Sequence, residues 1–259
     1  MAFKIIDAHM HLGPNPGRMV PDQAVESLIA QMDRLGIERC ISANRYGLRC
    51  MYEKSLANDL AASQKCDGRI YSFMLYHTKY ADQALNCIHA HKDDPRCVGL
   101  KVLPITDGVD ADSEAYRPLW EAARATGRAI MAHTWDVSTY NLGQKHAFPG
   151  KFEKWLAEYP DVTFVFGHSG GRYNGIKKAI ELGKKYPNAY YDIAGDIWQH
   201  GFLEELVEGI GDDRIIYGSD YTMIEHRPVL GIVYGANISN CSKEKILYYN
   251  AAKVYFKEE

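Results

Sequence analysis

The sequence has 259 residues, with 30 Lys and Arg against 33 Asp and Glu, which gives a formal net charge of -3 at pH 7. It is 46% hydrophobic and 24% charged, which is typical of a globular protein and excludes an intrinsically disordered chain. The near-neutral charge argues against a nucleic-acid binder. No apolar run reaches the roughly 20 residues of a membrane-spanning helix, and Asp7 comes too early for a signal peptide. We therefore expect a cytoplasmic protein without nucleic-acid or membrane partners.

Eight short apolar runs predict β-strands, and their starts lie 25 to 36 residues apart. This is the spacing of a strand plus one returning helix. Several runs, such as residues 162–166, are apolar throughout, which is typical of parallel strands covered by helices on both faces. The predicted strands are residues 3–8, 39–43, 70–76, 97–103, 129–133, 163–167, 189–193 and 214–218.

The stretches between the strands predict helices that end at Gly or before Pro. Residues 24–35 stop at Gly36, residues 118–125 stop before Gly127, and residues 176–185 stop before Pro187. Loops that leave strands are long, at residues 13–21, 104–116, 134–149 and 221–227, whereas loops that enter strands are short. Long loops after the strands are typical of a (β/α)8 barrel, whose active site lies at that end.

We therefore predict an α/β fold with a single domain over residues 1–259: a (β/α)8 TIM barrel with the last helix, residues 243–256, packed on the outside. A doubly wound open sheet stays an alternative, because counts of strands and helices cannot show that a sheet closes. The six cysteines have no Cys-x-x-Cys or zinc-finger spacing, so we expect them to be reduced and partly buried.

Polar residues follow four of the predicted strands. His9 and His11 end the first strand and, being two residues apart, project from the same face. His133, His168 and Asp220 follow the fifth, sixth and eighth strands. Because strand ends of a barrel surround one small volume, and imidazole and carboxylate groups suit divalent ions, these residues predict a metal centre. Asp7 is expected on the same face as His9.

The sequence resembles the amidohydrolase superfamily, specifically the amidohydrolase-related branch of metal-dependent hydrolases that includes aminocarboxymuconate-semialdehyde decarboxylase-like enzymes. The resemblance spans nearly the whole chain. It rests on the segments 6–11 (IDAHMH), 132–133 (AH), 167–171 (GHSGG), 217–220 (YGSD) and 249–256.

The resemblance implies that one divalent ion, zinc by preference and manganese as the alternative, is bound by His9, His11, His133 and Asp220. A metal-bound water would then act as the nucleophile, with Asp220 transferring protons and His168 orienting the water or polarising the substrate. In two-metal members a carboxylated lysine on the fourth strand bridges the ions. Lys101 lies on that strand, but we expect one metal.

Four side chains after strands are expected to bind a small-molecule substrate, with a carboxylate as one candidate: Arg45, Tyr76, Trp135 and Arg172. The glycines at 170 and 171 are expected either to let the backbone approach a ligand or to form a tight turn. His89 and His91 lie two apart in a predicted helix, so they do not face each other, and both are expected on the surface.

The main functional prediction is a hydrolase of amide, ester or lactone bonds. The alternative is nonoxidative decarboxylation of an aromatic or unsaturated carboxylic acid on the same metal, because the two reactions share their ligands. A noncatalytic binding barrel and a metal-independent lactonase are more distant alternatives. A homodimer is compatible with a barrel of this size, although the sequence points to no interface.

Overall fold

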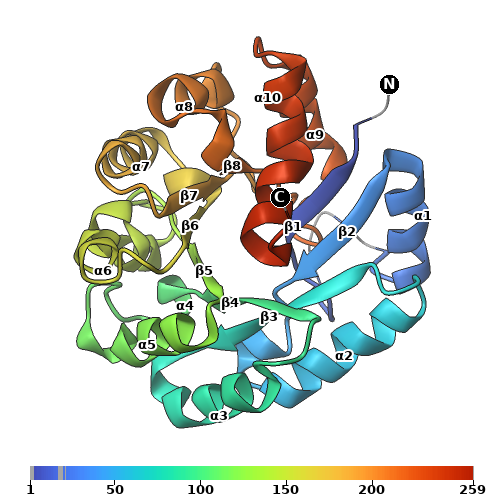
Figure 1. The fold of residues 1–259 in the computed structure, drawn as a ribbon, viewed down its shortest axis with the longest axis vertical. Coiled ribbons are helices and arrows are strands. Elements are labelled where there is room, and N and C mark those ends of the chain that lie inside the picture. The colour runs from blue at the N-terminus through green and yellow to red at the C-terminus, as the bar shows by residue number, and fades with distance from the viewer. Residues whose placement is uncertain (1–2, 17–19, 21, 259) are drawn as a thin grey trace.

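Eight parallel strands follow one another in chain order around a nearly closed barrel in the computed structural model, which describes residues 3–16, 20 and 22–258 (Figure 1). The first strand is joined to the residues that directly follow the last one by backbone hydrogen bonds from Ala8 N to Tyr217 O at 3.1 Å and from Asp220 N to His9 O at 2.8 Å. The predicted (β/α)8 barrel is therefore confirmed, and the open sheet is wrong. The strands are β1 (Ile5–Met10), β2 (Ile37–Ser42), β3 (Ile70–Tyr76), β4 (Cys97–Val102), β5 (Ala129–His133), β6 (Phe164–Gly167), β7 (Ala189–Asp192) and β8 (Ile215–Ile216).

Helices surround the strands on the outside (Figure 1). All three predicted ends are confirmed: α7 ends at Lys185, before Pro187, α1 ends at Gly36 and α5 at Gly127. Both glycines adopt left-handed backbone angles that most side chains avoid. The helices are α1 (Val25–Leu35), α2 (Tyr52–Gln64), α3 (Ala81–His91), α4 (Pro104–Asp107), α5 (Arg117–Thr126), α6 (Glu153–Glu158), α7 (Tyr173–Lys185), α8 (Phe202–Ile210), α9 (His226–Gly235) and α10 (Asn240–Glu244).

Two of the long predicted loops contain short helical segments. The loop 104–116 holds α4 and a 3-10 turn, and the loop 134–149 holds a 3-10 segment at Leu142–Ala147. In the loop 13–21, residues 17–19 and 21 lie outside the described residues. Within those described, no helix has the length and apolar character needed to cross a bilayer.

The chain after α10 continues as two π-helical segments, Lys245–Tyr249 and Ala252–Phe256, where one helix was predicted. It packs outside the strands, as expected, and covers the end of the barrel where the strands begin. There the Tyr255 ring lies 5.5 Å from the ring of Phe73, and both belong to one apolar cluster with Ile6 and Val165. Apolar packing therefore closes this end.

An irregularity in β1 changes which side chains share a face. Asp7 pairs with Cys40 and Met10 with Ser42, so three steps along β1 match two along β2. Such a bulge reverses the alternation of side chains. His9 therefore points into the barrel, whereas Asp7 contacts Ser219 and His226. The expectation that Asp7 shares the face of His9 is wrong for this reason.

Candidate active site

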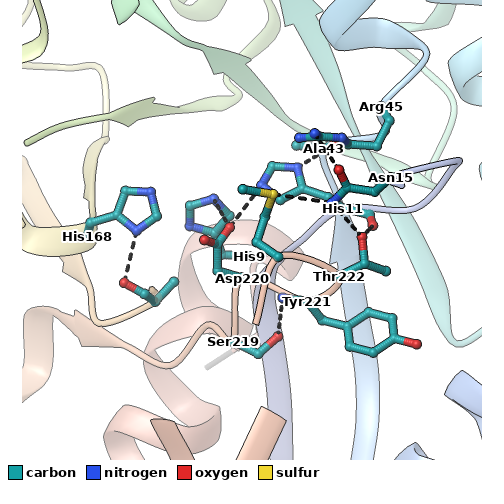
Figure 2. A network of polar contacts seen from close by, with 12 residues as sticks. His9, His11, Asn15, Ala43, Arg45, His168, Ser219, Asp220, Tyr221 and Thr222 are labelled. Carbon is teal, nitrogen blue, oxygen red and sulfur yellow. Dashed lines mark hydrogen bonds and ion pairs between the residues drawn. The ribbon is translucent and has the colours of Figure 1, made fainter. Parts of the chain in front are cut away.

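The carboxyl ends of five strands and the turns after them bring buried polar side chains together. His9 on β1, Lys101 on β4 and Asp192 on β7 are at most 1% exposed. His168 begins the turn after β6, and Asp220 follows β8; both have positive φ angles, 64° and 65°. Figure 2 shows His9 between His168 and His11, with the Asp220 carboxylate beside it.

Three of these residues form a compact donor group. The donor atoms of His9, His168 and Asp220 lie within 4.8 Å of one another. His11 Nε2 lies 3.1 Å from Asp220 Oδ1, and His9 Nε2 lies 4.0 Å from the same oxygen. Two or more imidazoles with one carboxylate are a donor set that suits a divalent cation, so the residues present fit the metal that the sequence predicts.

The outer ring nitrogens of three histidines have hydrogen-bond acceptors. His9 Nδ1 donates to Asp192 Oδ2 at 2.6 Å, His11 Nδ1 to Ala43 O at 2.6 Å, and His168 Nδ1 to Ala194 O at 2.9 Å. A metal-binding histidine usually donates its other N–H in this way, which fixes the tautomer and turns Nε2 toward the ion. Asp192 also accepts from His168 N at 2.8 Å, so it holds the His9 ring and the backbone of His168 together.

His133 is placed differently. Its Nε2 lies 2.9 Å from Gln144 Oε1, and its ring stacks on Trp135 with centroids 6.1 Å apart. The rings of His133 and His168 lie 4.8 Å apart, so His133 is near the group without belonging to it. The structure thus places His168, rather than His133, with His9 and Asp220. No pattern in the sequence singled out Gln144.

Burial determines the protonation of the site. It lowers the pKa of His9, and the charge of Lys101 lowers it further. Burial and His9 likewise lower the pKa of His168. Burial alone would raise the pKa of Asp220, but the hydrogen bond with His11 and the charge of His168 hold it below its usual value. Neutral imidazoles therefore face a carboxylate, which is the state that binds metals.

Lys101 is completely buried at the centre of the site. Its Nζ lies 2.7 Å from His9 Nε2, and burial lowers its pKa to about 8. Lysine is almost never fully buried without a partner. Its amine therefore lies among the polar groups of the site, with His9 as its partner, rather than unpaired in the apolar core.

Asp7 supports the turn that carries Asp220. Its carboxylate accepts hydrogen bonds from Ser219 N at 2.9 Å, Ser219 Oγ at 2.5 Å and His9 N at 3.2 Å. Buried His226 lies on the far side, with Nε2 3.3 Å from Asp7 Oδ2. One carboxylate thus ties β1 to the residues around Asp220. The signal in the sequence was the polar Asp7 within an apolar strand.

A cavity of about 700 Å³ opens above the donor group and is lined by His133, His168 and Asp220. Trp135 and Arg172, both expected to bind substrate, line it as well. Arg172 lies over the Trp135 ring, 5.0 Å from the ring centroid, and pairs with Asp196 at 3.0 Å.

The other two expected substrate residues lie elsewhere and do not line this cavity. Arg45 Nη2 donates to Asn15 Oδ1 at 2.7 Å, on the far side of His11 (Figure 2). Tyr76 is buried, and its hydroxyl donates to Ala115 O at 2.7 Å.

Gly170 and Gly171 make room for other parts of the protein rather than for a ligand. A Cβ on Gly170 would lie 2.4 Å from the backbone of Gly175, and one on Gly171 would lie 2.2 Å from the Trp135 ring. The tight-turn interpretation therefore explains them, and Gly171 lets Trp135 pack beside His168.

The amidohydrolase family model matches residues 6–257. The chain belongs to the amidohydrolase family. A search of curated proteins finds no match. Among solved structures, 5-carboxyvanillate decarboxylase from Sphingomonas paucimobilis is 14% identical, with a TM-score of 0.75 over 98% of this chain and 99% of that one.

Two further decarboxylase structures share the fold. The 2,6-dihydroxybenzoate decarboxylase from Rhizobium is 16% identical, with a TM-score of 0.74 over 99% of this chain and 100% of that one. The dihydroxybenzoic acid decarboxylase from Polaromonas, solved with manganese and 2-nitroresorcinol, is 17% identical, with a TM-score of 0.73 over 98% and 97%.

These comparisons correct the main functional prediction. The similar structures that carry a specific activity are mostly decarboxylases of aromatic acids, and three of them hold manganese. The expectation of a hydrolase of amide, ester or lactone bonds is therefore wrong, and the comparisons favour the alternative. The error arose because both reactions use the same strand-end ligands, so motifs on strands 1, 5, 6 and 8 cannot separate them.

Proposed function

We propose that this amidohydrolase-family protein catalyses metal-dependent, nonoxidative decarboxylation of an aromatic or unsaturated carboxylic acid. The observation that carries this proposal is that the similar structures with a specific activity are decarboxylases over nearly the full length of both chains. The site supports it, because one His and Asp donor group opens into a single cavity with an aromatic wall.

In this proposal His9, His11, His133 and Asp220 hold one divalent ion. Outer hydrogen bonds on His9 and His11 support their part of this set. We assign manganese first and zinc second, because manganese accompanies three of the similar decarboxylase structures. When bound, the ion supplies positive charge that stabilises the electron-rich substrate.

The reaction replaces a carboxylate with a proton. The bond between the ring carbon and the carboxylate breaks, its electron pair stays on that carbon, carbon dioxide leaves, and a proton takes its place. Asp220 and His168 both line the cavity, and we propose that they hold and deliver this proton. Trp135 forms a wall of the cavity, and Arg172 above it provides a charge for an acidic substrate.

The test uses manganese-loaded protein with 2,6-dihydroxybenzoate, 5-carboxyvanillate and a panel of unsaturated acids in D2O. We expect release of carbon dioxide and one deuterium at the carbon that lost the carboxylate, both measured by NMR. Asp220→Asn should lose this activity, and Cys241→Ser, an exposed position on α10, is the matched control. Manganese-loaded protein that converts none of these acids, or that incorporates solvent oxygen into products, would overturn the proposal.

Measuring the metal content of two variants distinguishes the proposed roles of His133 and His168. We expect His133→Ala to lose the metal and His168→Ala to keep it while losing turnover. Loss of the metal from His168→Ala with retention in His133→Ala would overturn this assignment and make His168 the ligand, since its donor atom also lies within 4.8 Å of those of His9 and Asp220.

A further inference from the structure

A second group of metal-binding side chains lies on the outer wall of the barrel, between α2 and α3. The donor atoms of Glu53, Cys87 and His91 lie within 4.8 Å of one another. His91 Nε2 is 2.9 Å from Glu53 Oε2. The two helices pack outside β3 and β4 (Figure 1), so this group is separate from the donor group inside the barrel.

The helices fix the positions of these donors. Cys87 and His91 are four residues apart on α3, so they lie on the same face of one rigid helix. Glu53 reaches them from the first turn of α2. The Cys87 side chain is only 5% exposed, whereas those of His91 and Glu53 are 30% and 70% exposed. The group therefore has a buried thiol at its base and an open side toward solvent.

A cavity of about 190 Å³ adjoins the group and is lined by Glu53 and His91 together with Asp94. It has room for water or a small ligand beside a bound ion. Three protein donors with space for one exchangeable ligand match the open coordination of zinc-like ions.

The donor types select the class of ion. A thiolate with an imidazole suits borderline-soft cations such as zinc and cobalt, whereas manganese and magnesium prefer oxygen donors. Burial and the neighbouring Glu53 raise the pKa of Cys87 to about 12. Without an ion, the Cys87 side chain is therefore a protonated thiol. A bound cation removes that proton outright.

We propose that Glu53, Cys87 and His91 form a second cation site, selective for zinc-like ions, that joins α2 to α3 away from the reaction centre. The site binds its ion whether or not the barrel mouth catalyses decarboxylation. Because an ion that binds only the folded state stabilises it, loading the site raises the unfolding temperature.

The test is a titration of manganese-loaded protein with Co2+, followed by the thiolate-to-cobalt charge-transfer absorption in the near ultraviolet. Among the residues that the structure describes, the donor group inside the barrel contains no cysteine, so we expect the band from the outer site alone. We expect one equivalent of Co2+ to produce it, and Cys87→Ser to abolish it. Cys241→Ser, which removes an exposed thiol on α10, should retain it.

His91→Gln and Glu53→Gln keep the cysteine and change a half-buried and an exposed position on their helices. Each should weaken Co2+ binding by more than about 100-fold, since partners that only orient a metal ligand already change affinity by about 10- to 100-fold. These variants decide the question if Cys87→Ser does not fold. Absence of the band in the unmodified protein, its persistence in Cys87→Ser, or unchanged affinity in both glutamine variants would overturn the proposal.

Discussion

The two ends of the barrel are built from the same strands but have opposite chemistry. Where the strands begin, Phe73 and Tyr255 pack in an apolar cluster. Where the strands end, His9, Lys101 and Asp192 are equally buried but polar or charged. Burying apolar surface stabilises the fold, whereas burying charge costs free energy unless each group is paired. The free energy gained by burial at the apolar end therefore offsets the cost of holding buried polar and charged groups together at the other end.

The largest expected effect is on activity, at the polar end. Asp220→Asn removes the charge but keeps a residue that tolerates the positive φ of 65° at this position. We expect kcat/KM for decarboxylation to fall by about a thousandfold or more, with the melting temperature nearly unchanged. Steady-state kinetics and thermal unfolding measure both. A variant that retains a tenth of the activity would show that the Asp220 carboxylate is not essential for the reaction.

The apolar end should show the reverse pattern. Phe73 is fully buried against Tyr255, so Phe73→Ala leaves a cavity and should lower the free energy of unfolding by about 3–5 kcal/mol. Urea denaturation measures this loss. Metal affinity of the protein that remains folded should be unchanged, and a parallel loss of metal binding would show that the two ends are not independent.

A side chain at position 171 would strain the backbone and also displace Trp135, which lines the cavity of the site. Gly171→Ala would place a Cβ 2.2 Å from the Trp135 ring, and strain and overpacking together should cost about 2–4 kcal/mol. Gly68→Ala is the matched control, because Gly68 also has a positive φ but no atom lies within 4 Å of its added Cβ. Only Gly171→Ala should also reduce kcat/KM. Equal losses in both variants would mean that the Trp135 contact is unimportant.

The smallest expected effect tests the cost of a buried charge. The folded protein lowers the pKa of Lys101 to about 8, below the usual value of about 10.4. The unfolded chain therefore binds an additional proton between these two pKa values, so the stability of metal-free protein should rise with pH across that window. Lys101→Met should remove this rise and stabilise the metal-free protein by about 1–3 kcal/mol at pH 7.

Urea denaturation between pH 7 and 10 compares Lys101→Met with the unmodified protein. A decrease in stability on substitution would show instead that the amine contributes more through its neighbours, His9 and the buried carboxylates, than it loses by burial.

Local sequence patterns were sufficient for the strands and helices of the barrel, although not for its closure. Uniform apolar runs, such as residues 162–166, and glycines, such as Gly36, determine the secondary structure of the few residues around them. Each element therefore formed close to its expected place. The strand-end residues His9 and Asp220 were also found from the sequence, because parallel strands in a closed barrel must end at one rim.

Other features depend on contacts between distant segments. The bulge in β1 separates Asp7 from His9 and depends on pairing with β2. The partner of His133 is Gln144, which lies in a long loop, and His91 meets Glu53 only because α2 packs beside α3. The hydrophobic periodicity of a single segment cannot predict such contacts between distant residues.

The sequence by itself determined the eightfold alternation of strands and helices and the placement of histidine and aspartate where strands end, since these follow from hydrophobic periodicity and chain direction. Only the tertiary structure decided which histidines group around Asp220, which face Asp7 takes, and that a thiol, an imidazole and a carboxylate meet on the outer wall. These outcomes depend on distances of a few ångströms between residues far apart in the chain, which packing sets and local pattern does not.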